Sequence, residues 1–223
     1  LATGAKRGAL SLSEPDAGTD TRNISCRAVR DGDEWIVNGT KTWVTNGERA
    51  SLVLLAARTE EGISAFVVEK EPGPEWGGLR VSKNIGKLGY KGLETVEMAY
   101  VDHHMPADSL LGEAGRGLPQ ILSVLEQGRI NIAARAVGVG RAAFDAALAY
   151  AQQRVTMGKP IAEHQAIQLK LADMATRTEA SRLLVEAAAR AYDEGRRCDL
   201  EAGMAKLFAT EIAQEVVLDA MRI

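Results

Sequence analysis

The sequence is poor in the residues that mark a disulfide scaffold, a metal centre or a membrane span. Its 223 residues include two cysteines and three histidines. Cys26 and Cys198 lie far apart and form no C-x-x-C or Cys/His ligand motif, so two reduced thiols and no metal site are expected. Reduced thiols fit a cytosolic or matrix compartment. No apolar run approaches the roughly 20 residues that cross a bilayer, and no signal peptide opens the chain.

A strong charge of either sign is also lacking. The 27 lysines and arginines nearly balance the 30 aspartates and glutamates, which leaves a net charge of -3. A nucleic-acid partner is therefore not expected. The chain starts without Met and stops at "LDAMRI" without a helix stop signal, so we expect a fragment of a longer protein.

The hydrophobic period changes near the middle of the chain. From Ala9 to about Pro106, alternating or β-branched stretches such as "ISAFVVEK" are cut by Gly, Asn and Pro. This pattern predicts an antiparallel sheet, sandwich or barrel of about seven strands. After "LLGEAGRGLP" the apolar residues recur at helical spacing, which predicts helices over Leu118–Arg154, Ile161–Glu194 and Leu200–Ile223.

The breaks between these helices are short, so the helices should run antiparallel in a bundle. The expected fold class is α+β, with a central antiparallel β-domain over 1–113 and an incomplete helical bundle over 114–223. "GVGRAA" matches a relaxed dinucleotide loop, but it stands within a helical stripe without the strand that this motif needs. Close helix packing is the better interpretation.

Three short stretches carry polar groups that a ligand needs, and each also has a structural interpretation. His103 and His104 are adjacent on a strand, face opposite sides and are expected at the surface. "LSLSEPDAGTD" leads from a strand into a loop that offers hydroxyls and backbone N–H groups, although on local chemistry a turn capped by its own Asp and Ser is favoured. "KTWVTNG" places Trp43 and Thr45 on one strand face with Val44 turned away.

Trp43 is ambiguous on local grounds. A tryptophan on a β face usually belongs to the core, but an indole beside a hydroxyl also suits a flat ring that needs stacking and one hydrogen bond.

Taken together, four stretches resemble the acyl-CoA dehydrogenase family. "LSLSEPDAGTD" is similar to the family's "TEPGAGSD", and "NGTKTWVTNG" to its "NGxKxWITNG". "LGYKGLETVEMAYVDHHMPADSLLGEAGRGLPQIL" resembles the segment that leads into the C-terminal helices. "RVTMGKPIAEHQAIQLKLADM" is similar to "RxxFGxPLxxxQxxQxxLADM". The motifs occur in the family's order and spacing and cover almost the whole chain.

The resemblance implies a β-domain and the first three helices of a four-helix bundle, usually in a homotetramer (or a homodimer). It implies FAD as cofactor and α,β-dehydrogenation of acyl-CoA thioesters, in which a carboxylate removes the α-proton and the β-hydrogen leaves as hydride. Electron-transferring flavoprotein is the implied electron acceptor.

The resemblance also assigns roles to single residues. Leu10, Leu12, Ser13 and Thr19 match the loop along the flavin, and Thr19 also matches a CoA contact. Trp43 matches the indole against the flavin ring, next to Val44, and Thr45 matches the hydroxyl near the hydride-accepting nitrogen.

A second set of matches lies in the helical half. Arg154 matches the arginine that reaches the FAD diphosphate of a neighbouring subunit, and Thr156, His164 and Gln165 lie near the same FAD.

"EQGR", with Glu126 and Arg129, matches the stretch along the CoA pantetheine. Most members have Asp where this chain has Glu126. Two branches place the catalytic Glu where this chain has Gly128, and the others carry it near the C-terminus, so we expect the base beyond Ile223. Glu126 lies about 200° round a helix from position 128 and should face elsewhere.

Three functions are compatible with these motifs. The first is an acyl-CoA dehydrogenase, the second an acyl-CoA oxidase or flavin monooxygenase of the same fold, and the third a non-catalytic partner subunit without the base. The Ala- and Arg-rich composition indicates a bacterial cytoplasmic enzyme, with the mitochondrial matrix as the alternative.

Overall fold

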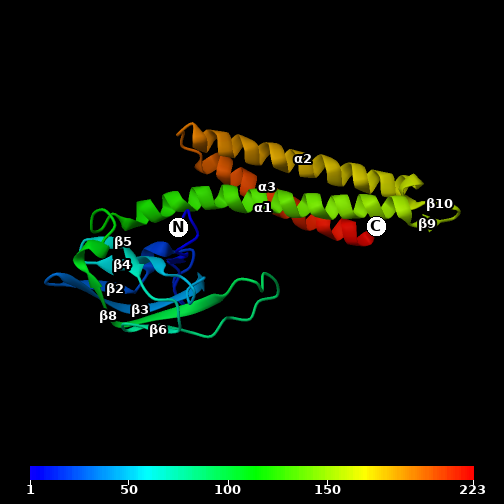
Figure 1. Cartoon of the computed structure of the whole chain (residues 1–223). Coiled ribbons are helices and arrows are strands. Elements are labelled where there is room, and N and C mark those ends of the chain that lie inside the picture. Colours follow the sequence, from blue (N-terminus) through cyan, green and yellow to red (C-terminus); the bar gives the residue numbers. More distant parts are fainter. The chain divides into compact units, whose positions relative to one another are not determined.

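The computed structural model describes residues 1–223 and divides them into two compact units, Leu1–Leu122 and Ser123–Ile223. Each unit is described by itself. The first unit holds the strands drawn in blue to green in Figure 1. They are β1 (Gly8–Ser11), β2 (Arg27–Asp31), β3 (Glu34–Thr45), β4 (Leu52–Thr59), β5 (Gly62–Glu69), β6 (Glu75–Trp76), β7 (Leu79–Val81) and β8 (Thr95–Pro106), with 3-10 turns η1 (Thr21–Asn23) and η2 (Ala107–Ser109).

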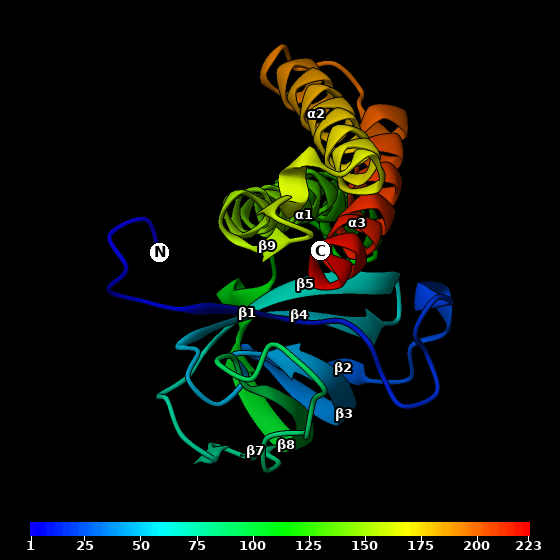
Figure 2. The same cartoon turned by 90° about the vertical axis from the view of Figure 1, so that its right-hand side faces the viewer.

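All eight strands belong to one sheet. The strand order is β1-β4-β2-β3-β8-β7-β6, and β5 pairs with β4. β4 pairs with β5 along its whole length and with β1 and β2 over successive parts. The sheet curls into a half-barrel, in which β1, β4 and β5 form one layer and β2, β3 and β8 the other (Figure 2). Most pairs are antiparallel, as expected. However, β4 lies parallel to β1, with Leu52 opposite Gly8, and to β2, with Arg58 opposite Arg27, and neither pairing was predicted.

Apolar side chains fill the inside of the curl. The largest cluster contains Trp35 and Phe66, whose rings meet edge to face with centroids 5.3 Å apart. A second cluster joins Leu12 and Ala17 to Ile121, which lies in the first turns of α1 (Gly117–Gln153). The residue at the start of α1 must be Gly117, because a Cβ there would lie 2.2 Å from the backbone nitrogen of Ala65.

Strand β3 is interrupted by two irregularities in its pairing with β8. One lies between Val37 and Gly39 and the other between Lys41 and Val44. At Gly39 a Cβ would come within 2.6 Å of the Cα of Cys26, so β3 packs tightly here against the backbone that leads into β2. Bulges of this kind re-aim the side chains of the strand that carries them.

The expectation of surface exposure is wrong for one of the two adjacent histidines. His103 is only 3% exposed, and its Nδ1 lies 2.5 Å from the carbonyl oxygen of Gly77. The cause is an irregularity at Asp102, which has a φ of 43°, so that His103 turns inward. Burial lowers the pKa of His103. His104 is exposed and pairs with Glu34 at 2.9 Å.

The second unit consists of helices. After α1 come a small hairpin of β9 (Val155–Thr156) and β10 (Lys159–Pro160), the 3-10 turn η3 (Ile161–Glu163), α2 (Gln165–Asp193) and α3 (Asp199–Arg222). The three helices run up and down, as predicted (Figure 1). The start predicted for the second helix is wrong by four residues, because Ile161–Glu163 form a 3-10 turn after Pro160. "GVGRAA" lies inside α1 and follows no strand.

Alanines dominate the contacts between these helices. Ala133, Ala188, Ala205 and Ala209 are at most 1% exposed and belong to one apolar cluster. Small side chains let helices approach closely. Lys170 on α2 and Asp219 on α3 add an ion pair at 2.8 Å.

Three general features complete the description. Both cysteines are free and buried. None of the helices combines the length and hydropathy that spanning a membrane would require. No group of three or more His, Cys, Asp and Glu side chains is placed to hold a metal ion.

Candidate functional site

Trp43 is the most unusual residue of β3. Its indole is 61% exposed, and its φ of 59° lies in the left-handed region that bulky residues rarely occupy. Val44 is fully buried, and Thr45 is exposed again. The interpretation of Trp43 as a core residue is therefore wrong, since the second irregularity of β3 turns the indole outward.

The loop that follows β1 is folded as a tight turn. Glu14 and Ala17 exchange two backbone hydrogen bonds, of 2.9 and 3.2 Å. Leu12 and Ala17 are buried, whereas Leu10 and Ser13 are half-buried and Thr19 is exposed. A turn capped by its own Asp and Ser side chains was favoured on local chemistry. The turn is confirmed, but Asp20 makes no side-chain cap, and the carboxylate of Glu14 is the side chain that holds the loop.

This loop and the Trp43 segment lie side by side, although about 30 residues separate them. The backbone N–H of Thr42 donates to the carbonyl of Ser13 at 2.8 Å. The ammonium of Lys41 donates to the carbonyl of Leu12 at 2.9 Å and to Glu14 Oε1 at 2.8 Å. The structure thus brings together Leu10, Leu12, Ser13, Trp43, Val44 and Thr45, all of which were candidate site residues.

The sequence-based reasoning missed Glu14 and Lys41. Their side chains are 3% and 0% exposed, so they form a buried ion pair. Burial alone would raise the pKa of Glu14, but hydrogen bonds from Lys41, Ser25 and Cys26 outweigh it and hold the pKa below its ordinary value. One signal was available, since Glu14 follows the apolar strand residues of the first motif and Lys41, of opposite charge, opens the second.

The turn after Thr45 has its own buried support. Glu94, 7% exposed, accepts the backbone N–H of Arg49 at 2.8 Å. Lys70, 4% exposed, donates to the carbonyls of Glu48 and Glu71 at 3.0 and 2.9 Å. Burial lowers the pKa of Lys70. These contacts fix the backbone on the far side of Thr45.

The helical unit carries a second group of candidate residues on the β9–β10 hairpin and the start of α2. Arg154, Thr156 and Gln165 are exposed. Thr156 Oγ1 lies 3.1 Å from His164 Nε2, and the Arg154 carbonyl accepts the N–H of Ile161 at 2.8 Å. The hairpin therefore gathers Arg154, Thr156, His164 and Gln165 at one end of the bundle.

The remaining candidates lie on α1. Glu126 is half-buried and Arg129 is exposed. A hydrogen bond from Arg197 to Asp199 raises the pKa of Arg197, and the charge of Glu126 adds to this effect. Glu126 therefore lies near the link between α2 and α3. A Cβ at Gly128 would meet no atom within 4 Å.

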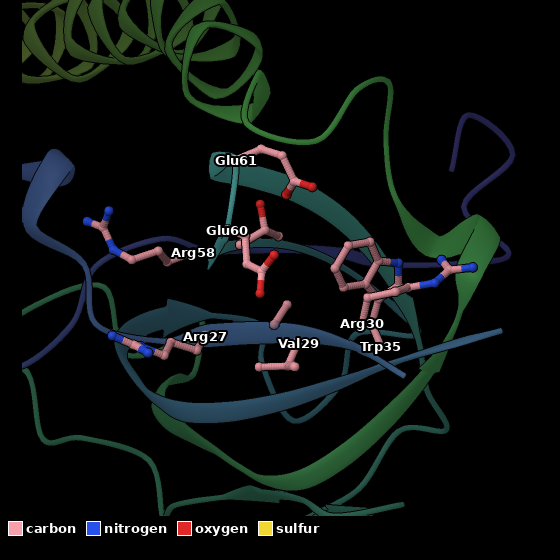
Figure 3. A pocket seen from close by; sticks show the side chains of 9 residues that line it. Arg27, Val29, Arg30, Trp35, Arg58, Glu60 and Glu61 are labelled. Carbon is pink, nitrogen blue, oxygen red and sulfur yellow. The ribbon is translucent and has the colours of Figure 1, made fainter. Parts of the chain in front are cut away.

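A hollow of about 400 Å³ lies elsewhere in the first unit, between the β2–β3 and β4–β5 turns. Figure 3 shows the Trp35 ring at one end, Arg27 and Arg58 at the other, and Glu60 between them. Arg58 is held by the carbonyls of Ile24 and Arg22 at 3.1 and 2.6 Å. None of the candidate site residues lines this hollow.

Comparison with known families matches both units. The family model described as acyl-CoA dehydrogenase, middle domain, matches residues 9–102, and the model described as acyl-CoA dehydrogenase, C-terminal domain, matches residues 115–223. This chain belongs to the acyl-CoA dehydrogenase family. The first family match includes the Trp43 segment and the loop that Glu14 holds, and the second includes the β9–β10 hairpin.

Individual relatives support the same assignment. An acyl-CoA dehydrogenase of Bacillus subtilis is 42% identical over 228 residues, and a mitochondrial short-chain specific acyl-CoA dehydrogenase of Bos taurus is 42% identical over 226 residues. These matches cover 100% and 99% of this chain but only 59% and 54% of the relatives. The solved butyryl-CoA dehydrogenase of Megasphaera elsdenii superposes with a TM-score of 0.92 at 37% identity, over 97% of this chain and 57% of that one.

Proposed function

We propose that this chain is the part of an acyl-CoA dehydrogenase that holds FAD and orients an acyl-CoA thioester for α,β-dehydrogenation. The observation that carries the proposal is the presentation of Trp43. Its indole is exposed, its backbone is left-handed and the neighbouring residues are buried. Strained backbone of this kind clusters at functional sites. The exposed hydroxyl of Thr45 stands on the same strand, two residues away.

The residues around Trp43 fit an isoalloxazine ring. The indole offers a flat face for stacking, and the Thr45 hydroxyl offers a hydrogen bond at the edge of the ring. Leu10, Ser13 and Thr19 have side chains that reach the surface, whereas Leu12 and Val44 are buried. We therefore assign Leu12 and Val44 a backbone role in flavin binding.

We assign the hairpin group to the diphosphate of FAD in a neighbouring subunit of a homotetramer or homodimer. The guanidinium of Arg154 is suited to two parallel hydrogen bonds with a phosphate. Thr156, His164 and Gln165 supply further polar groups next to it. If this assignment holds, an isolated subunit binds FAD weakly.

The redox chemistry belongs to the cofactor, which accepts the β-hydrogen as hydride when it is bound. The residues of this chain bind and orient. Trp43 and Thr45 fix the flavin ring, and Thr19, Glu126 and Arg129 contact the CoA part of the substrate. Because Gly128 has no carboxylate, we assign removal of the α-proton to none of the residues 1–223.

We assign reoxidation of the flavin to an electron-transferring flavoprotein. One similar solved structure supports this partner, since it is described as the electron-transferring flavoprotein of Acidaminococcus fermentans. Its matched chain covers 100% of this chain, with a TM-score of 0.95 and 39% identity, and this chain covers 59% of it.

Absorption spectroscopy tests the proposal. The purified full-length protein that contains this chain should be yellow, and an acyl-CoA of suitable length should bleach it without oxygen. A series from short to long acyl chains identifies the substrate. Peroxide release in air would instead identify an oxidase, and a colourless protein that binds no added FAD would contradict the proposal.

A further inference from the structure

The buried ion pair of Glu14 and Lys41 joins two segments that both belong to the candidate flavin site. Lys41 Nζ lies 2.8 Å from Glu14 Oε1 and 2.9 Å from the carbonyl oxygen of Leu12. Glu14 follows the loop residue Ser13 directly, and Lys41 precedes Trp43 by two positions. The pair is thus hydrogen-bonded to the backbone of the loop and stands two residues from the indole in the sequence.

The carboxylate of Glu14 has hydrogen-bond donors at both oxygens. Oε2 accepts the backbone N–H and the hydroxyl of Ser25, at 2.6 and 2.7 Å. Oε1 accepts the backbone N–H of Cys26 at 3.0 Å as well as the ammonium of Lys41. A carboxylate held by four donors cannot rotate without breaking several bonds at once, so its position is sharply defined.

Lys41 of the same pair borders the irregularity of β3 that exposes Trp43. In a regular strand, Lys41, Trp43 and Thr45 would share one face. Instead, Lys41 is fully buried while Trp43 and Thr45 are exposed. The N–H of Thr42 donates to the carbonyl of Ser13 at 2.8 Å, and the next residue, Trp43, has a φ of 59°.

Buried ion pairs contribute little net stability compared with apolar groups of the same size, because both charges lose their hydration. An apolar pair would suffice if the site only needed a packed interior. We propose that Glu14 and Lys41 are positioning residues, which lock the Leu12–Ser13 backbone to β3 and hold Trp43 in the left-handed conformation that presents its indole. The consequence for flavin binding rests on the proposed function, whereas the consequence for the backbone does not.

The test compares the native protein with the double variant Glu14→Gln/Lys41→Met, which leaves no unpaired charge in the interior. A single Lys41→Met variant is a poorer choice, because it leaves a buried carboxylate without its cation. The control is Thr59→Val. It removes a buried hydroxyl that lies 3.0 Å from Ser64 Oγ and 3.1 Å from the Gly62 carbonyl, at the turn between β4 and β5.

Two readouts separate positioning from general stability. The first is amide hydrogen exchange without flavin, over peptides 10–20, 41–46 and 52–69. The double variant should exchange at least tenfold faster in the first two peptides and remain unchanged in the third. The second is the dissociation constant for FAD, which should rise at least tenfold. Thr59→Val should change neither the first two peptides nor the FAD affinity.

The outcomes are distinct. Unchanged exchange in peptides 10–20 and 41–46, or faster exchange spread evenly over the sheet, would overturn the proposal. Native FAD affinity in a double variant whose peptides 10–20 and 41–46 exchange faster would also overturn it. If the native protein binds no FAD, the proposed function fails, and the exchange readout still decides whether the pair positions the two segments.

Discussion

Trp43 shows how a single residue can oppose local preferences. Left-handed backbone costs a residue other than glycine about 1 to 2 kcal/mol. Because the indole is 61% exposed, its burial stabilises the protein too little to offset this strain. By contrast, Trp35 is only 6% exposed and packs on Phe66. The two tryptophans are therefore expected to respond differently to substitution.

Replacement of Trp43 by Gly should keep or raise the melting temperature, because glycine adopts the left-handed conformation without strain. The same change should weaken FAD binding at least tenfold, by removal of the stacking face. Trp35→Ala is the matched control and should lower the free energy of unfolding by about 3 to 5 kcal/mol. Thermal denaturation and FAD titration measure both effects. A Trp43→Gly protein that melts as badly as Trp35→Ala would show that Trp43 is structural.

Glu14 predicts the direction of a pH effect. Its folded pKa lies below the ordinary value of 4.5, so the unfolded chain binds a proton more readily than the folded chain. The stability that Glu14 contributes is therefore complete above about pH 4.5 and is lost as the pH falls through the folded pKa.

Denaturant unfolding from pH 3 to 7 measures this effect. The difference in unfolding free energy between native protein and Glu14→Gln should be about 3 to 5 kcal/mol at pH 7 and should shrink below pH 4.5. Glu60→Gln, on the exposed turn between β4 and β5, should differ from native by less than about 0.5 kcal/mol throughout. A difference for Glu14→Gln that stays constant down to pH 3 would refute the expected linkage.

The residues of the candidate site differ in how far sequence patterns reveal them. Trp43 and Thr45 could be selected because an indole and a hydroxyl two residues apart on a strand point the same way. The same rule places Lys41 on that face, and it fails because the irregularity between Lys41 and Val44 turns Trp43 outward while Lys41 stays buried. It fails for His103 through the irregularity at Asp102. Bulges depend on partners far along the chain, so local alternation cannot indicate them.

Among the elements, α1 contains one glycine in open space and one in close contact with neighbouring backbone. A Cβ at Gly128 would meet open space, whereas a Cβ at Gly117 would lie 2.2 Å from the Ala65 nitrogen and 2.3 Å from the Ser64 carbonyl carbon. Glycine lowers helix stability relative to alanine unless packing requires it. The same substitution, glycine to alanine, should therefore change the free energy of unfolding in opposite directions at the two positions.

Gly128→Ala should raise the free energy of unfolding by about 0.5 to 1 kcal/mol, because alanine loses less backbone entropy in a helix. Gly117→Ala should lower it by about 1 to 3 kcal/mol, since the neighbouring backbone must move. Equilibrium denaturation with a helix-sensitive probe measures both. A destabilised Gly128→Ala protein would indicate that α1 is crowded at this position.

Helix positions were more predictable than strand partners. The helical periodicity of α1 and α3 located their bounds within two residues, because both helices bury a continuous stripe of alanines and other apolar residues. The parallel pairing of β1 with β4 could not be predicted in this way. Alternation indicates that Gly8–Ser11 is extended, but it contains no information about which distant strand will bind it.

At the scale of the whole molecule, each compact unit contains one buried cysteine. Cys26 is 0% exposed in the first unit and Cys198 is 1% exposed in the second. Burial raises the pKa of Cys26 to about 11, so its thiol is protonated at neutral pH as well as shielded. The two thiols can therefore report on the two units separately.

Neither cysteine should react with a thiol reagent in the native protein at pH 8, and both should react in denaturant. At intermediate denaturant, mass spectrometry of the labelled peptides should show when each unit opens. Cys26→Ser and Cys198→Ser variants assign the signals. Rapid labelling of Cys26 under native conditions would contradict the buried environment described for it.

The parallel pairing of β1 with β4 also limits when β1 can fold during synthesis of the chain. Strand β1 must wait for a partner that the ribosome adds about 40 residues later, which takes roughly 2 to 8 seconds at typical translation rates. During that interval the nascent chain carries "ALSL" without its neighbours, and the loop that Glu14 will anchor also waits for Lys41. Assembly of the proposed flavin site therefore cannot be complete before β4 has left the exit tunnel.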